Sequence, residues 1–322
     1  MDPLSELLSL LKPQSYASGG VALHEEMAIQ WPAHAGIKCY AVVSGRCWLS
    51  VEGMNEPLLL QAGDCYLLPP GPPFCLATEP DATPVDFYTL RESGKLGPDV
   101  VPGQQESCFL VGGHFVLSGE AADLLLSALP AVVCIQQPES KAAMRWALDQ
   151  MTDEVRHPRP GGALIIQQLA WMMLIQALRL HLVQQPAVGW LYALADKQLS
   201  LALTCMHKEP AFNWTLEKLA ERVGMSRSAF AARFKAVTGA SAIDYLTRWR
   251  MMLACDRLRQ SGDSLARIAV TLGYESESAF GKAFKRVMGC SPPAVFKGIA
   301  AGDQGCWRLP GIIRSSVLSF QT

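Results

Sequence analysis

The sequence predicts an α+β chain with two modules: an N-terminal β-barrel or jelly roll followed by two helices, and a C-terminal all-α module. Three observations support this prediction. Short apolar runs separated by Gly and Pro fill residues 1–135. From Ala195 onward, apolar residues recur at helical spacing instead. Two segments of the C-terminal half, which begin at Ser226 and Ser276, repeat each other at an offset of 50 residues.

Length and charge set the limits of this organisation. The 322 residues suffice for two ordinary domains, and the 50% hydrophobic content predicts substantial buried cores. We expect a β-rich domain at 1–135, a helical dimerisation or linker region at 136–189, a helical domain at 190–299 and a tail at 300–322. Residues 190–299 carry a net charge of +7, and residues 1–189 carry −9. This division is typical of a protein whose second half binds polyanions.

The β-rich region consists of short apolar runs with turn residues between them. Ser44-Gly45 and Glu52-Gly53 are the expected turns. The expected strands are Ile37–Val43, Arg46–Val51, Pro57–Gln61, Asp64–Leu68, Val85–Leu90, Cys108–Val111 and His114–Leu117. Many short strands with regular turns favour a sandwich or a small barrel.

One segment of this region carries a family motif. The run Gly63–Phe74, with Pro69 and Gly71 at fixed spacing, resembles the second motif of the cupin family. Phe74 stands where that motif has a metal-binding His, and the His-x-His pair of the first cupin motif occurs nowhere in the chain. The resemblance therefore implies a cupin-like barrel that holds no metal and no other cofactor. Its interior is expected to bind a small molecule or to respond to a signal.

Aromatic residues are the candidates for the wall of an effector pocket in this barrel, with barrel packing as their alternative role. They are Trp31, Tyr40, Trp48, Tyr66 and Phe74. The histidines of the region, His24, His34 and His114, are expected to be satisfied imidazoles rather than ligands.

Two helices are expected in the middle region. Glu139–Val155 is amphipathic, whereas Ala163–Gln184 is apolar nearly all round. Gln167, Arg179 and other polar residues interrupt the second helix, which argues against a membrane span. Such a helix must be covered by the barrel or by a second subunit, and we expect a homodimer. Gln184–Gly189 is the expected hinge.

The C-terminal region is predicted to be helical throughout. The expected helices span about 196–208, 215–223, 227–238, 242–260, 265–272, 277–288 and 292–298. Thr215, Ser226, Ser264 and Ser276 are expected N-caps, and Gly residues mark the helix ends. A short helix, a Gly turn and a Ser-capped second helix form a helix-turn-helix motif, and the chain has two. The second turn, Gly273 to Glu275, is one residue longer than the first.

Two such motifs around a long helix, closed by Cys-Ser-Pro-Pro at 290–293, resemble the DNA-binding region of the AraC/XylS family of bacterial transcription regulators. The resemblance covers roughly 196–298, although Phe296 stands where the family usually has Tyr. It implies double-stranded DNA as the partner, with one recognition helix in each of two successive major grooves. The residues that it implies for base contacts are Arg227, Ser228, Ala231, Ala232, Glu277, Ser278 and Lys282.

Basic residues near the helix ends and on the long helix are candidates for phosphate contacts. They are Lys235, Arg248, Arg250, Lys285 and Arg286. An internal ion pair with Asp244 or Asp256 is an equally weighted alternative for Arg250.

These patterns predict an effector-responsive, sequence-specific transcription regulator in the bacterial cytoplasm, without enzymatic activity. RNA polymerase is a further candidate partner, and the N-terminus lacks the features of a signal peptide. Two alternatives stay open. A thiol-based oxidant sensor would use Cys39, Cys47, Cys65 and Cys75 of the predicted barrel, for which core packing is the competing role. A cupin enzyme fused to a DNA-binding module is the other alternative. The sequence assigns no role to residues 300–322.

Overall fold

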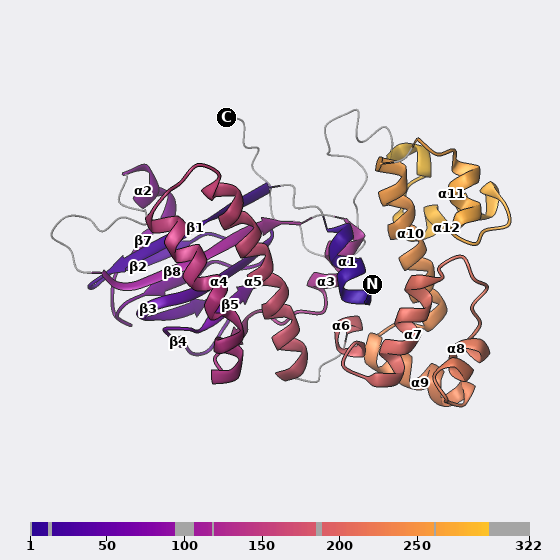
Figure 1. Cartoon of the computed structure of the whole chain (residues 1–322), viewed down its shortest axis with the longest axis horizontal. Coiled ribbons are helices and arrows are strands. Elements are labelled where there is room, and N and C mark those ends of the chain that lie inside the picture. Colours follow the sequence, from indigo (N-terminus) through magenta and orange to yellow (C-terminus); the bar gives the residue numbers. More distant parts are fainter. Residues whose placement is uncertain are drawn as a thin grey trace. The chain divides into compact units, whose positions relative to one another are not determined.

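The computed structural model describes residues 2–11, 15–93, 106–117, 119–184, 189–260 and 262–295. The chain divides into two compact units (Figure 1). One unit is Leu11–Asp196, and the other combines Met1–Leu10 with Lys197–Thr322. The sequence did not indicate that the first ten residues belong with the C-terminal half. Residues 185–188 of the expected hinge, Phe296 and the tail 300–322 lie outside the described residues.

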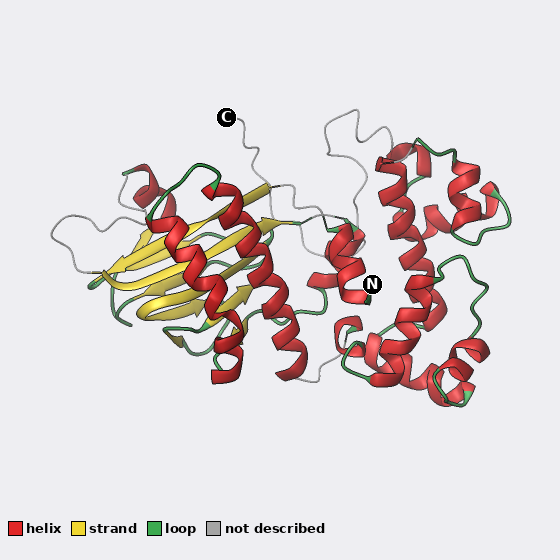
Figure 2. Cartoon of the chain, in the orientation of Figure 1, coloured by secondary structure: helices red, strands yellow, loops and turns green. Residues whose placement is uncertain are grey.

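The unit Leu11–Asp196 is built on a nine-stranded sheet (Figure 2). Its strands are β1 (Ser15–His24), β2 (Ala28–Trp31), β3 (Ile37–Val51), β4 (Leu58–Gln61), β5 (Cys65–Leu68), β6 (Phe74–Ala77), β7 (Pro84–Asp86), β8 (Glu106–Val116) and β9 (Val133–Ile135). The main path runs β1-β8-β3-β6-β2-β7, while β4 pairs with β3, and β5 pairs with β3 and β9. The β2–β7 pair is parallel and the other pairs are antiparallel.

Strand β3 curls the sheet because it changes partners along its length. Its first half pairs with β5 and β8, and its second half pairs with β4 and β6. The register shifts between Val42 and Ser44, which marks a β-bulge. A Cβ on Gly45 would overlap the carbonyl oxygen of Ser107, so the strand needs Gly there. The expected turn at Ser44-Gly45 is therefore wrong, and its place is taken by a bulge within one 15-residue strand.

Other strand predictions hold in part. The Glu52-Gly53 turn is confirmed. Of the expected strand Val85–Leu90, only Val85 and Asp86 lie in a strand, β7. The side chain of Asp86 accepts a hydrogen bond from the Thr89 N–H and so starts helix α2 (Phe87–Glu92). The two runs expected around residues 108–117 form the single strand β8. A Cβ on Gly112 in its middle would overlap the Cys39 carbonyl oxygen, so this Gly permits close strand approach and does not form a turn.

Two long helices, α4 (Pro138–Arg156) and α5 (Gly162–Gln184), cover one face of this sheet (Figure 2). Lys141 of α4 pairs with Asp64 at 2.6 Å. Helix α5 buries Met173, Leu174 and Ala177 in its middle. Its length and apolar composition would suffice to cross a membrane, and these are the only membrane-like features that it has. Residues 138–184 thus belong to the same unit as the sheet and do not form a separate region. The short helices α3 (Glu120–Leu126) and α6 (Trp190–Ala193) complete the unit.

The second unit is helical. It contains α1 (Pro3–Leu10), α7 (Lys197–Lys208), α8 (Leu216–Arg222), α9 (Arg227–Thr238), α10 (Ala242–Gln260), α11 (Leu265–Thr271) and α12 (Glu277–Met288). The four predicted N-caps are confirmed, since each side chain accepts a hydrogen bond from the main chain three residues later. Gly239 and Gly289 end α9 and α12 in the left-handed conformation. The α8–α9 and α11–α12 pairs are the two helix-turn-helix motifs, and α10 joins them.

Candidate functional site

The two recognition helices, α9 and α12, present corresponding faces to solvent. Each buries a Phe pair completely, Phe230 with Phe234 and Phe280 with Phe284, and this packing fixes the rotation of each helix. The residues implied for base contacts lie on the opposite faces. Arg227, Ser228, Ala232, Glu277, Ser278 and Lys282 are exposed, and Ala231 is half-buried. The positions are therefore accessible, and their base contacts stay a prediction.

The two faces differ in chemistry. Arg227 of α9 forms an ion pair with Glu217 of α8, with Nε and Oε1 2.7 Å apart and both side chains more than half exposed. An ion pair this exposed is screened by solvent and contributes little, so Arg227 can leave Glu217 for a DNA group. The other α9 positions offer only a hydroxyl and two methyl groups. Helix α12 offers both an acceptor, Glu277, and a donor, Lys282.

The structure corrects the phosphate set at one position. Lys235, Arg248, Lys285 and Arg286 are exposed, as a phosphate contact requires. Arg250 is half-buried, and its Nε and Nη2 donate to the carbonyl oxygens of Pro210 and Phe212 at 2.6 and 3.0 Å. These two hydrogen bonds to main-chain carbonyls take the place of the expected ion pair with Asp244 or Asp256, and they speak against Arg250 as a phosphate contact.

Arg250 instead connects the loop before the first helix-turn-helix motif to the turn of the second motif. The loop 209–214, which precedes α8, lies against the turn of the second motif: a Cβ on Gly273 would overlap the Ala211 carbonyl oxygen. The Arg250 guanidinium lies 5.6 Å from the ring centroid of Tyr274 in that turn. The extra residue in the second turn was the sequence signal of this contact, which joins the loop before α8 to the turn between α11 and α12.

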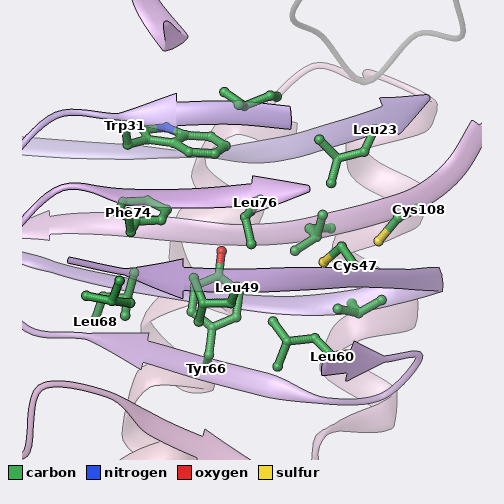
Figure 3. Packing of buried hydrophobic residues seen from close by; sticks show 14 of the residues in the cluster. Leu23, Trp31, Cys47, Leu49, Leu60, Tyr66, Leu68, Phe74, Leu76 and Cys108 are labelled. Atoms are coloured by element: carbon green, nitrogen blue, oxygen red, sulfur yellow. The ribbon is translucent and has the colours of Figure 1, made fainter. Parts of the chain in front are cut away.

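In the other unit, the curled sheet is hollowed by a cavity of about 210 Å³. Four of the five expected aromatic residues line it: Trp31, Tyr40, Tyr66 and Phe74. Figure 3 shows Trp31 and Phe74, from the paired strands β2 and β6, and Tyr66, from β5, in the same apolar cluster. The Trp31 and Phe74 rings stack with centroids 4.9 Å apart. These residues therefore pack the sheet and also form a pocket wall.

Trp48 does not line the cavity. Side chains alternate along a strand, so Tyr40 and Trp48 would share a face of a regular β3. The bulge between Val42 and Ser44 shifts the alternation, and Cys47 and Leu49 face the apolar cluster instead. Trp48 is consequently removed from the pocket candidates.

Sequence reasoning missed the cations of this cavity, Lys38 and Arg91. Lys38 is only 8% exposed, and its Nζ lies 5.7 Å from the Phe74 ring centroid. Burial lowers the pKa of the Lys38 ammonium to about 8. A Lys inside an otherwise apolar strand was the available signal.

The residues around Phe74 do not fit a metal ion. His34 and His114 lie nearby, with ring centroids 6.1 Å apart, and the positive charge of Lys38 faces both. Burial, followed by the charge of Lys38, lowers the pKa of His34 to about 4 and also lowers the pKa of His114. A fixed ammonium repels a second cation at this place. Within the described part of the chain, no group of three or more His, Cys, Asp or Glu side chains is placed to hold a metal.

Three of the four thiols considered for oxidant sensing pack in the core, and Cys75 is partly buried. Cys39, Cys47 and Cys65 are buried, and the Sγ atoms of Cys39 and Cys65 are 4.0 Å apart. A hydrogen bond with Cys108, and then burial, raises the pKa of Cys47; a hydrogen bond with Cys39, and then burial, raises the pKa of Cys65. Since the thiolate is the form that oxidants attack, this arrangement favours the packing role over oxidant sensing.

Comparison with known proteins agrees with both halves of this description. The cupin family model matches residues 2–183, and a helix-turn-helix domain model matches residues 219–298. A Streptomyces lividans protein described as an AraC-like transcription regulator is 41% identical over 298 residues, which cover 91% of this chain and 97% of that protein. The HTH-type transcriptional regulator AlkR of Acinetobacter baylyi is 30% identical over 302 residues, covering 91% of this chain and 98% of AlkR. Among solved structures, the DNA-binding domain of AdpA in complex with a target DNA matches with 27% identity and a TM-score of 0.30, covering 37% of this chain and 100% of that domain.

A cupin-type sheet domain with two helix-turn-helix motifs after it defines a DNA-binding transcription regulator that responds to an effector. Each alignment covers nearly the whole of this chain and of the relative, so the relatives share both the sheet unit and the helical unit. The chain belongs to the AraC/XylS family of transcription regulators.

Proposed function

We propose that this regulator recognises its operator with α9 and α12 in two successive major grooves and that a small molecule in the cavity of the sheet controls it. One observation carries the proposal. Helices α9 and α12 have the same Ser and Gly caps, each buries a Phe pair, and each exposes the opposite face to solvent. Base contacts come from Arg227, Ser228, Ala231 and Ala232 on α9 and from Glu277, Ser278 and Lys282 on α12. Phosphate contacts come from Lys235, Arg248, Lys285 and Arg286.

The regulator acts as a homodimer through its sheet unit. The support for this is that the two long helices leave large apolar side chains in solvent: Trp146 of α4 is 63% exposed, and Leu164 and Ile165 of α5 are 66% and 46% exposed. A second copy of the chain would cover them. The protein works in the cytoplasm, without enzymatic activity, and RNA polymerase is its expected protein partner.

A footprint on operator DNA tests the proposal. The full chain would first select fragments from a genomic library, and hydroxyl-radical cleavage would then map the bound sites. Two protected tracts about 10 base pairs apart on one face of the duplex are expected for each copy. Protection of one groove alone, or no retention of duplex in low-salt buffer, would contradict the use of both motifs.

A further inference from the structure

The cavity in the sheet has the size and surface of a binding site for a small molecule. Its volume of about 210 Å³ lies below the roughly 300–1,000 Å³ of pockets for drug-sized ligands, so a smaller molecule is required. Trp31, Phe74, Phe87, Leu76 and Leu110 make most of its wall apolar. The site therefore favours a compact ligand with an apolar body.

Lys38 supplies an unpaired charge to this apolar site. Its side chain is more than nine-tenths buried and lines the cavity. Its contacts among the described residues are with the ring of Phe74 and, electrostatically, with two imidazoles; no carboxylate is within ion-pair distance of it there. A buried ammonium without a counter-charge is unfavourable unless a ligand provides one.

The surroundings of Lys38 also select for an anion. The described lining contains no Asp or Glu, and its second charged group, Arg91, is another cation. Burial raises the pKa of the Tyr40 hydroxyl to about 12 and raises the pKa of the Tyr66 hydroxyl as well. Both hydroxyls thus stay protonated and can donate hydrogen bonds to an oxyanion.

We infer that the cavity binds a small monocarboxylate with an aromatic body, whose carboxylate pairs with the Lys38 ammonium while the ring packs among Trp31, Phe74 and Phe87. The inference rests on the proposed function, because it names the chemical class of the effector. In the cupin motif that Gly63–Phe74 resembles, the position of Phe74 is a metal-binding His. Here a lysine ammonium takes over the positive charge.

Three probes of one shape test the charge requirement. Phenylacetate, neutral phenylacetamide and cationic 2-phenylethylamine would be titrated into the full chain by calorimetry at pH 7. Phenylacetate is expected to bind at least about 10-fold more tightly than the amide, and the amine not at all. Equal binding of the acid and the amide, or no binding of the acid, would overturn the inference.

Two variants assign the effect to Lys38. Lys38→Met removes the charge and keeps an apolar side chain of similar length, and it is expected to weaken phenylacetate binding about 100-fold while leaving the amide unchanged. Arg46→Met is the matched control, since exposed Arg46 lies on the same strand outside the cavity lining. If Lys38→Met does not fold, the role of Lys38 is tested by measuring phenylacetate affinity of the unaltered chain over a pH series. Above the pKa of about 8, phenylacetate affinity should fall roughly 10-fold per pH unit, and a flat profile would refute the role of Lys38.

DNA binding measured on the same preparation separates this inference from the proposed function. Retention of duplex DNA without carboxylate binding would refute the effector class alone. Carboxylate binding without any retention of DNA would refute the regulator proposal and leave the cavity assignment standing.

Discussion

The Nδ1 atom of His207 lies 3.1 Å from Oε2 of Glu6, although the two residues are 201 positions apart in the sequence. On its other side, Nε2 of His207 lies 2.8 Å from the Tyr245 hydroxyl, and the ring stacks on Trp249 with centroids 3.7 Å apart. Both ring nitrogens of a buried imidazole are thus satisfied, one of them by the N-terminal helix α1. This helix is therefore a structural part of the DNA-binding unit.

Replacing Glu6 should loosen that unit. Glu6→Ala leaves a buried imidazole nitrogen without its partner, which is expected to lower the free energy of unfolding of the helical unit by about 1–3 kcal/mol. Faster hydrogen exchange of the α7 and α10 amides would show the effect. Ser9→Ala on the exposed side of the same helix is the control. Identical exchange in the two variants would mean that the Glu6 contact contributes nothing.

The turns of the two helix-turn-helix motifs allow a matched comparison. Gly224 and Gly273 both have positive φ, +69° and +81°, but a Cβ on Gly224 would meet nothing within 4 Å. Gly224→Ala should therefore cost about 1–2 kcal/mol for the left-handed backbone alone. Gly273→Ala should cost about 2–5 kcal/mol, because its methyl group also displaces the loop at Ala211. Urea unfolding of the two variants checks the difference, and equal midpoints would exclude the contact between the motifs.

The two classes of proposed DNA contact should differ in their effect on specificity. Lys282→Ala is expected to relax the preference at one or two base pairs, by about 1–3 kcal/mol. Lys235→Ala should instead weaken all sequences alike and reduce the slope of log affinity against log salt by about 1. Competition binding against a library of operator variants measures both. A uniform loss from both substitutions would remove Lys282 from the base contacts.

The buried imidazole of His34 predicts acid sensitivity of the sheet unit. Its pKa is about 4 in the folded chain, against an ordinary value of 6.5. Between these two pH values the unfolded chain binds a proton that the folded chain does not, so the free energy of unfolding falls as the pH falls from 6.5 to 4. His34→Asn keeps a donor for the Gly36 carbonyl and should flatten this dependence. His157→Asn, at a side chain that is 73% exposed, should leave it unchanged, and the reverse pattern would locate the effect elsewhere.

The thiols allow the packing role to be separated from a redox role. Cys47 and Cys65 are buried with raised pKa values, so iodoacetamide at pH 8 should modify them only after unfolding. Partly buried Cys75 should react earlier in the folded chain. Mass spectrometry of timed samples with and without urea gives the rates. Rapid native modification of Cys47 or Cys65 would restore the oxidant-sensor alternative.

The helical unit was predictable because its signals are local. Ser226 and Ser276 mark helix starts, Gly239 and Gly289 mark helix ends, and the Phe pairs mark buried faces, all within a few residues of one another. Arg250 was assigned wrongly because its carbonyl partners come from a loop about 40 residues earlier, and nothing local distinguishes it from exposed Arg248.

The sheet unit was less predictable because its determinants are distant in sequence. The role of Gly45 depends on the approach of Ser107, and a bulge reverses the direction of every side chain after it, including Trp48. The aromatic pocket wall could still be named, since Phe74 occupies a recognisable motif position. Lys38 was overlooked because its burial and its place in the cavity wall depend on which strands surround it.

The position of α1 affects how the protein is made. Glu6 of this helix is synthesised 201 residues before His207, which is roughly 10–40 s of synthesis at ordinary rates. During that interval the apolar side chains of Leu4, Leu7 and Leu8 have no docking surface on the helical unit. A nascent chain would therefore complete its sheet unit before the DNA-binding unit can close, and newly made molecules would acquire operator binding last.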